Sequence, residues 1–309
     1  MRLASFSTNA IPQVRMGLVQ NQEIIDVNLA AHALRIQPYS QMLDLLENQA
    51  ESIPTLHTIL EEFHAQPFGT VRTSGAVHNL ESVQLAAPIP RPRKNILCIG
   101  RNYHDHALES YQMRGQERPT DDAPVFFTKA TTSINAPYGQ IVVDPAISTE
   151  IDWEVELAVI IGKAGKNISE ADALAHVFGY TVLNDVTARD VQEKYKQFFK
   201  GKSLDGYCPM GPCIVTADEI PDPQRLTVRL RVNGVLKQEA QTSNMIYSVQ
   251  RMIAILSQGM TLEPGDIIAT GTPSGIGKAR KPPEYLKPGD IMETEIDGIG
   301  LMRNEIIGC

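Results

Sequence analysis

The sequence predicts an α+β protein that is rich in strands and carries a small α/β segment at its N-terminal end. Alternating patterns typical of β-strands recur through the second two thirds of the chain, where helical patterns are few. Strands and helices do not alternate regularly there, which favours a mixed sheet over a doubly wound parallel one. The 309 residues are 42% hydrophobic and 21% charged, so the chain can bury a large core.

Residues 1–87 differ from the rest and are predicted to form a small variable domain. Residues 14–28 alternate like a hairpin, and residues 42–49 and 55–66 have apolar side chains at helical spacing. The segment APIPRPRKN then places three prolines within five residues, a composition typical of an extended linker. The second domain is therefore predicted to span residues 88–309.

The second domain is predicted to consist mostly of strands. Asn233 and Gly234 form the strongest hairpin-turn signal in the chain. Strands are expected at 96–100, 141–144, 150–162, 179–185 and 266–272, with a hairpin over 226–241. Helices are expected from about His104, over 168–177 and over 245–260.

Composition excludes several classes of function. The net charge is −8 and no long Lys/Arg run occurs, so nucleic acid is not expected as a partner. The apolar runs are too short to cross a bilayer, and the N-terminus lacks the apolar stretch of a secretory signal. A cytoplasmic location is expected, and the four cysteines, in no metal-binding spacing, are expected to be free thiols.

The strand predicted over 150–162 carries an acid at every second position of its first half. Because side chains alternate between the two faces of a strand, Glu150, Asp152, Glu154 and Glu156 share one face. Core-like residues continue that face toward the strand's end. Acids that enter a buried region must be neutralised, paired or bound to a cation.

Glu154 and Glu156 are the candidate metal ligands, together with Asp185 at the end of the strand predicted over 179–185. Three carboxylates meeting from two strands make an all-oxygen site that suits hard cations such as Mg²⁺ or Mn²⁺. An acidic strand exposed to solvent is the alternative interpretation of the same residues. Glu150 and Asp152, nearer the start, are expected to be exposed or to support the ligands indirectly.

Three further patterns suggest a catalytic site. His106 and Glu109 are three residues apart on a predicted helix, so a carboxylate can orient an imidazole that activates water. Lys202 lies in a glycine-rich stretch and, beside a metal, could stabilise an oxyanion. The loop TGTPSGIG, which contains Thr272, matches neither the P-loop nor the dinucleotide fingerprint, but its backbone amides can approach a ligand. Taken alone, each pattern also fits ordinary surface structure.

In combination and in this order, the motifs resemble the fumarylacetoacetate hydrolase family. The resemblance covers residues 88–309 and rests on GRNYHDHALE, FFTKATTSI, DWEVELAVIIGK, GYTVLNDVTARDVQ, GKSLDGYCPMGP and TGTPSGIG. It implies a mixed β-roll as catalytic domain, a homodimer and a variable N-terminal domain. FFTKATTSI departs from the commoner pattern because Ala130 stands where proline is frequent.

The resemblance also implies roles for ten side chains. As metal ligands it implies Glu154, Glu156 and Asp185, with Mg²⁺ expected and Mn²⁺ possible. As catalytic residues it implies His106, Glu109 and Lys202. As residues that hold the substrate it implies Gln192, Thr272, Arg101 and Lys129.

The reaction implied by the resemblance is metal-dependent hydrolysis of a carbon–carbon bond in a 2,4-dioxo acid, an acylpyruvate such as fumarylpyruvate or acetylpyruvate. The His106–Glu109 dyad, which activates water, favours this reaction. Decarboxylation or tautomerisation of oxaloacetate, and isomerisation or hydration of a dienoic 2-oxo acid, are alternatives that use the same metal-stabilised enolate. A non-catalytic metal-binding protein would have no use for His106, Glu109 and Lys202 together.

A polar segment at 108–124 follows the dyad and is predicted to be a mobile lid over the site. Arg114 or Arg118 would then reach a second carboxylate on the substrate. A disordered surface loop is the alternative.

Overall fold

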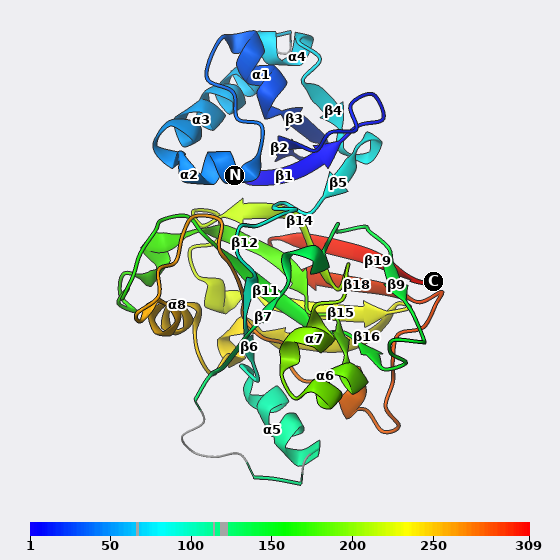
Figure 1. The fold of residues 1–309 in the computed structure, drawn as a ribbon. Helices are drawn as coiled ribbons and strands as arrows, with labels where there is room; N and C mark the ends of the chain where they lie inside the picture. Colours follow the sequence, from blue (N-terminus) through cyan, green and yellow to red (C-terminus); the bar gives the residue numbers. More distant parts are fainter. Residues whose placement is uncertain (66–67, 114, 118–122) are drawn as a thin grey trace.

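The computed structural model describes residues 1–65, 68–113, 115–117 and 123–309, and its framework is one large mixed sheet (Figure 1). The strands of this sheet are β1 (Arg2–Ser7), β2 (Arg15–Gln20), β3 (Glu23–Asp26), β4 (Val77–Asn79), β5 (Gln84–Ala86), β6 (Ile96–Gly100), β7 (Val125–Lys129), β8 (Ile134–Asn135), β11 (Val155–Ile161), β12 (Val177–Asn184), β14 (Cys208–Thr216) and β17 (Ile267–Ala269). They run in the order β4-β3-β2-β1-β14-β12-β11-β17-β6-β7, with β5 on β1 and β8 on β14.

A second sheet packs beside the first. It has the order β16-β15-β18-β19-β9, and β10 and β13 form a separate pair. The strands are β9 (Ile141–Val143), β10 (Ile151–Asp152), β13 (Thr187–Ala188), β15 (Thr227–Val232), β16 (Val235–Gln241), β18 (Ile291–Ile296) and β19 (Gly300–Gly308). The turn between β15 and β16 is the predicted hairpin, since Asn233 and Gly234 both have positive φ, at 52° and 75°.

Apart from α3, which has 17 residues, the helices are short. The α-helices are α1 (Val27–Leu34), α2 (Met42–Glu47), α3 (Gln49–Ala65), α4 (Thr70–Thr73), α5 (His104–Met113), α6 (Arg189–Tyr195), α7 (Phe198–Lys202) and α8 (Val249–Ser257). Single 3₁₀ turns are η1 (Leu80–Ser82), η2 (Thr131–Ser133), η3 (Ala173–His176), η4 (Pro223–Arg225), η5 (Thr242–Asn244) and η6 (Gly277–Ala279). This sheet-dominated arrangement confirms the predicted α+β class.

The N-terminal elements gather on one side of the molecule, above the larger part (Figure 1). The predicted hairpin is β2 with β3, and the two predicted helices are α2 and α3. β1 pairs antiparallel with β14, with Leu3 opposite Ile214, so the large sheet continues from the N-terminal elements into the rest of the chain. The division into domains 1–87 and 88–309 stays a prediction.

The strand predicted over 150–162 is interrupted in its middle. β10 ends at Asp152 and β11 begins at Val155. Between them, the amide of Trp153 donates to Asp152 Oδ1 and the amide of Glu154 donates to Asn184 Oδ1, at 2.8 and 3.1 Å. Because these two amides bond to side chains, the hydrogen-bond ladder is interrupted between β10 and β11. The prediction of one continuous strand from Glu150 to Gly162 is therefore wrong.

From Glu154 on, the predicted alternation holds. Val155, Leu157 and Val159 pack into one core cluster, and Ala158 and Ile160 pack into a second cluster on the opposite face. Both faces of β11 are therefore buried, as expected. The second face continues backward to Glu156 and Glu154, so the fold brings these acids to the end of a buried strand.

The helix predicted over 168–177 is wrong, because only the short turn η3 forms there. The amide of Asn167 bonds to the Ser257 carbonyl, and the amide of Ile168 bonds to the Ser257 hydroxyl. These tertiary bonds to the end of α8 fix the backbone amides at the start of the segment where the local pattern favoured a helix. The four cysteines are free thiols, as predicted. No helix among the described residues combines the length and the apolar character needed to cross a bilayer.

Candidate active site

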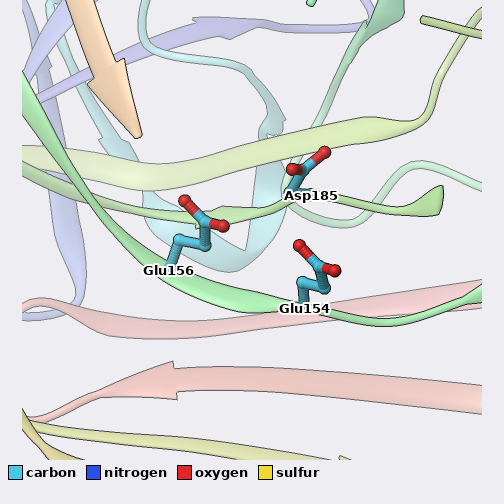
Figure 2. A group of neighbouring side chains, drawn as sticks. All are labelled: Glu154, Glu156 and Asp185. Carbon is cyan, nitrogen blue, oxygen red and sulfur yellow. The ribbon is translucent and has the colours of Figure 1, made fainter. Parts of the chain in front are cut away.

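Three buried carboxylates converge where two neighbouring inner strands of the large sheet, β11 and β12, begin and end (Figure 2). Glu154, Glu156 and Asp185 are 5%, 1% and 0% exposed. One oxygen of each lies within 4.8 Å of one oxygen of the other two. A group of three hard oxygen donors at this spacing could hold a metal ion.

The pairing of β11 with β12 brings the three acids together. Val155 lies opposite Asn184 in the antiparallel ladder, so Asp185 directly follows a residue that faces the start of β11. The amide of Asp185 donates to the carbonyl of Glu154 at 2.9 Å, which holds the two backbones in contact beyond the ladder. The convergence expected from two separate strands is thus produced by neighbouring strands in register.

Two buried lysines neutralise part of this negative charge. Lys202 Nζ lies 2.9 Å from Glu154 Oε2, 2.5 Å from Asp185 Oδ2 and 2.9 Å from the Thr187 hydroxyl. Lys129 Nζ donates to Asp185 Oδ1 at 2.7 Å and to the carbonyl of Lys202. Lys202 is only 2% exposed because α7 turns it inward, so it is not the solvated loop lysine that its motif alone would allow.

Arg189 is a third buried cation, which the sequence analysis did not single out. Its guanidinium donates to Asp152 Oδ2 at 2.8 Å, to Glu154 Oε1 at 2.6 Å and to Gln192 Oε1 at 3.2 Å. A signal was available, because Arg189 and Gln192 are three residues apart at the start of α6, and Arg189 lies only four residues after Asp185. Asp152 is fully buried and is a partner of Arg189, which also bonds to Glu154. Of the two expectations for this acid, exposure is therefore wrong, and indirect support of the candidate ligands agrees with the structure.

The surroundings give the two glutamates opposite pKa shifts. Burial raises the pKa of Glu154, but Lys202 and Arg189 outweigh it and bring the pKa down to about 2. Burial and the charges of Asp185 and Glu154 raise the pKa of Glu156 well above its ordinary value. The ionised form of Glu156 is therefore less well stabilised by the protein than that of Glu154, so a bound cation would stabilise Glu156 more.

His106 and Glu109 form the predicted pair on α5. His106 Nδ1 lies 3.1 Å from Glu109 Oε2, and the amide of Gly275 donates to the other carboxylate oxygen at 3.2 Å. The imidazole is therefore held by a carboxylate that is itself fixed by the glycine-rich loop. With Nδ1–H donating to Glu109, the lone pair of Nε2 is free to act as a base.

The glycine-rich loop is tied to β11 at two points. The amide of Gly271 donates to Glu156 Oε2 at 2.8 Å. Gln238 donates to the Thr272 hydroxyl at 2.9 Å and accepts from the Val155 amide at 3.1 Å. These bonds place the hydroxyl of Thr272 at the start of β11, beside the carboxylates.

A cavity of about 370 Å³ lies over the carboxylates. Seven of the ten predicted site residues line it: Arg101, His106, Glu154, Glu156, Gln192, Lys202 and Thr272. The other three, Glu109, Asp185 and Lys129, do not line it. Glu109 contacts the lining residue His106, and Lys129 contacts Asp185. Lining residues that the sequence analysis missed include Arg189, Glu193, Lys196 and Lys278. The volume suits a small organic acid.

The predicted lid is only partly described. Residues 108–113 complete α5, and Arg101 lies 4.9 Å from the ring of Tyr111 on that helix. Arg114 and Arg118, predicted to reach the substrate, lie outside the described residues. The lid stays a prediction.

Replacing Asp152 with asparagine is expected to destabilise the protein by about 3 kcal/mol, because it removes the main counter-charge of a buried arginine. Asp152 also accepts hydrogen bonds from the backbone amides of Gly277 and Lys278, at 2.6 and 3.1 Å. The NH₂ group of an asparagine would face one of these N–H groups and could not accept its hydrogen bond. Urea unfolding followed by tryptophan fluorescence measures the effect. A loss no larger than that of the exposed control Asp205→Asn would show that Asp152 is not needed to balance Arg189.

Comparison with known proteins places the chain among related enzymes. Residues 95–307 match the family described as Fumarylacetoacetate (FAA) hydrolase C-terminal. The chain is 51% identical over 231 residues to oxaloacetate tautomerase YisK of Bacillus subtilis, covering 74% of this chain and 75% of the relative. It is 41% identical over 311 residues to the mitochondrial oxaloacetate tautomerase fahd2 of Xenopus laevis, covering 99% and 90%.

A solved structure agrees with the fold over the whole chain. Maleylpyruvate hydrolase of Sphingobium sp. SYK-6, in complex with manganese (II) ion and pyruvate, aligns with a TM-score of 0.77 at 30% identity. The alignment covers 100% of this chain and 99% of that one. That protein is named a hydrolase, but its sequence identity to this chain is lower than the identity of either tautomerase.

The predicted hydrolysis of an acylpyruvate is wrong on this comparison. The two relatives at 41–51% identity are tautomerases, and they match the alternative reaction instead. The dyad misled the prediction because a carboxylate-oriented histidine is a base for any proton, whether of water or of carbon. The chain is an enzyme with a small-molecule substrate, and it belongs to the fumarylacetoacetate hydrolase family.

Proposed function

We propose that this protein is an oxaloacetate tautomerase, which interconverts the keto and enol forms of a dicarboxylic 2-oxo acid. The observation that carries the proposal is the identity of 41% with an oxaloacetate tautomerase across 99% of the chain. The site agrees, because tautomerisation needs a base beside a carbon acid and positive charge beside the oxygen. His106 and Lys202 line the same cavity and offer both.

We propose Mg²⁺, or Mn²⁺ in its place, as the cofactor held by Glu154, Glu156 and Asp185. The fit rests on three hard oxygen donors within 4.8 Å of one another. It also rests on the raised pKa of Glu156, because the ionised form of this carboxylate would gain stability from a cation. The manganese in the related hydrolase structure supports the same class of metal. When bound, such a cation draws electron density from the 2-oxo group and makes the neighbouring C–H more acidic.

His106 is the proposed proton carrier. Nε2 removes a proton from the carbon between the 2-oxo group and the distal carboxylate, the C–H electron pair becomes the C=C bond, and the oxo oxygen gains the negative charge. Return of the proton to that oxygen gives the enol, and the reverse sequence gives the ketone. Glu109 keeps Nδ1–H pointing away from the substrate and stabilises the imidazolium between the two transfers.

Lys202 is proposed to act as a fixed positive charge beside the developing oxyanion. Burial lowers its pKa, but Asp185 and Glu154 outweigh burial and raise the pKa above its ordinary value. The ammonium therefore stays protonated and is no base. Lys129 is proposed to hold Asp185 in place, while Gln192, Thr272 and Arg101 are proposed to bind substrate oxygens from the cavity wall.

The test is an assay that separates tautomerisation from loss of CO₂. Crystalline enol-oxaloacetic acid is dissolved with the protein and Mg²⁺, and the ultraviolet absorbance of the enol is followed while pyruvate is measured in parallel. We expect the enol to disappear faster than without protein, with no pyruvate above background. Pyruvate formed as fast as oxaloacetate is lost would make the protein a decarboxylase, and an unchanged enol decay would refute the proposal.

Two further expectations stay predictions. The homodimer implied by the resemblance is checked by light scattering of the purified protein. The cytoplasmic location is checked by fractionation of the source cells, and the mitochondrial name of the Xenopus laevis relative makes this worth doing.

A further inference from the structure

An ion pair joins two residues that line the cavity, Lys278 and Glu193. Helix α6 lines the cavity with Arg189, Gln192 and Glu193, which recur at the spacing of one helical face, and Lys196 lines it directly after the helix ends. Lys278, at the turn η6 on another wall, also lines the cavity, and its Nζ pairs with Glu193. The Glu193 side chain is 67% exposed and that of Lys278 is 25% exposed.

Lys278 differs from the deeper cations of the cavity. Arg189 and Lys202 are buried and each bonds to two acids, so their positive charge is already committed. The partner of Lys278 is an exposed carboxylate, and solvent screens such a pair until it contributes little. The ammonium of Lys278 can therefore exchange Glu193 for another carboxylate at small cost.

The backbone of Lys278 is anchored although its ammonium is exchangeable. Its amide and that of Gly277 donate to Asp152, which is buried. Gly277 has no space for a side chain, since a Cβ there would lie 2.0 Å from the carbonyl oxygen of Glu284. The lysine thus extends from a fixed point of the cavity wall, and only its flexible side chain needs to move.

We propose that Lys278 selects substrates with a second carboxylate, and that Glu193 holds the lysine when no substrate is bound. The inference rests on the proposed function and names how that site recognises a dicarboxylic acid. The 2-oxo end of the substrate lies at the Glu154 side of the cavity, and its distal carboxylate displaces Glu193 from Lys278. Because the substrate is already held at one end, this exchange occurs within the complex and is favoured.

The two members of the pair then have opposite effects on binding. Removing the charge of Lys278 removes a contact of the distal carboxylate and weakens binding of dicarboxylates. Removing the charge of Glu193 removes a competitor and strengthens it. A pair that merely held the two walls together would give losses in the same direction from both changes.

Binding of malate and lactate to the protein in Mg²⁺ buffer tests the proposal. These stable 2-hydroxy acids differ by one distal carboxylate. Trp153, the single tryptophan, reports binding, because its Nε1 donates to the Gly275 carbonyl at 3.1 Å beside the η6 turn. For Lys278→Gln we expect the Kd of malate to rise about three- to tenfold and that of lactate to stay within about twofold. For Glu193→Gln we expect malate to bind about twofold more tightly.

Lys287→Gln is the matched control, since it removes an equal charge from an exposed position that does not line the cavity. The proposal is overturned if wild-type protein does not prefer malate, if Lys278→Gln changes both ligands equally or neither, or if both variants weaken malate. Because the readout is binding, it is independent of the enol assay. A failed enol assay with the expected malate pattern would refute the tautomerase proposal and leave this inference standing.

Discussion

Replacing His106 with glutamine is expected to slow enol–keto conversion of oxaloacetate by about 10²–10⁴-fold, the usual contribution of a positioned general base. Glutamine keeps a polar side chain of similar reach, but it cannot accept and return a proton. The imidazole is 7% exposed, and within the described part of the chain His106 is the histidine that lines the cavity. Initial rates of enol decay at saturating substrate measure the effect on kcat.

His104→Gln is the matched control, because His104 is exposed at the start of the same helix and does not line the cavity. It should leave the rate unchanged. Glu109→Gln should lower kcat less than His106→Gln does, since it loses only the orientation of the imidazole. If His106→Gln retains the full rate while malate still binds, the proton is carried by another group and the proposed mechanism is wrong.

Replacing Glu156 with glutamine is expected to lower the rate by at least about 100-fold, because loss even of residues behind a metal ligand commonly costs 10–100-fold. The variant should bind Mg²⁺ or Mn²⁺ too weakly to retain it through gel filtration. Metal content of the filtered protein, measured by mass spectrometry, checks this directly. Treatment of the wild type with a chelator should abolish the activity, and added Mg²⁺ or Mn²⁺ should restore it.

Although Glu156→Gln is expected to lower the rate and the metal affinity, it should raise the stability of the metal-free protein. The folded state raises the pKa of Glu156, so its negative charge costs free energy at every pH above the pKa of an unfolded glutamate. Glu156→Gln removes this cost and should stabilise the metal-free protein at neutral pH. Urea unfolding with and without chelator measures it.

Glu150→Gln, which alters an acid of the same segment outside the carboxylate cluster, is the control for Glu156→Gln. It should change neither metal content nor rate. A Glu156→Gln protein that keeps its metal and its rate would show that the three carboxylates are a structural acidic cluster and no cofactor site.

Several parts of the site were predictable because short motifs carry local geometry. A three-residue spacing on a helix brings His106 to Glu109, and a two-residue spacing on a strand puts Glu154 and Glu156 on one face. These relations depend on nearby residues only. The same local reasoning failed at 168–177, where bonds to Ser257 replace the helix.

Other parts depended on partners far away in the chain. Asp152 is buried because Arg189 and the amides of Gly277 and Lys278 surround it, and these arrive from two other elements. The alternation of acids from Glu150 onward gave no sign that the strand would break after Asp152. The motif resemblance also reached the family but not the reaction, since an oriented histidine serves hydrolysis and tautomerisation equally.

By itself the sequence determined the α+β class, the hairpin at Asn233–Gly234, the free cysteines and the three acids that could hold a metal, because these follow from local periodicity and short motifs. Only the tertiary structure decided how the charges are balanced. Lys129, Arg189 and Lys202 reach the carboxylates through strand pairing and through the helices α6 and α7. Burial makes each unpaired charge costly, so the identity of these partners depends on which side chains share the low-dielectric space, and that is a property of the folded chain.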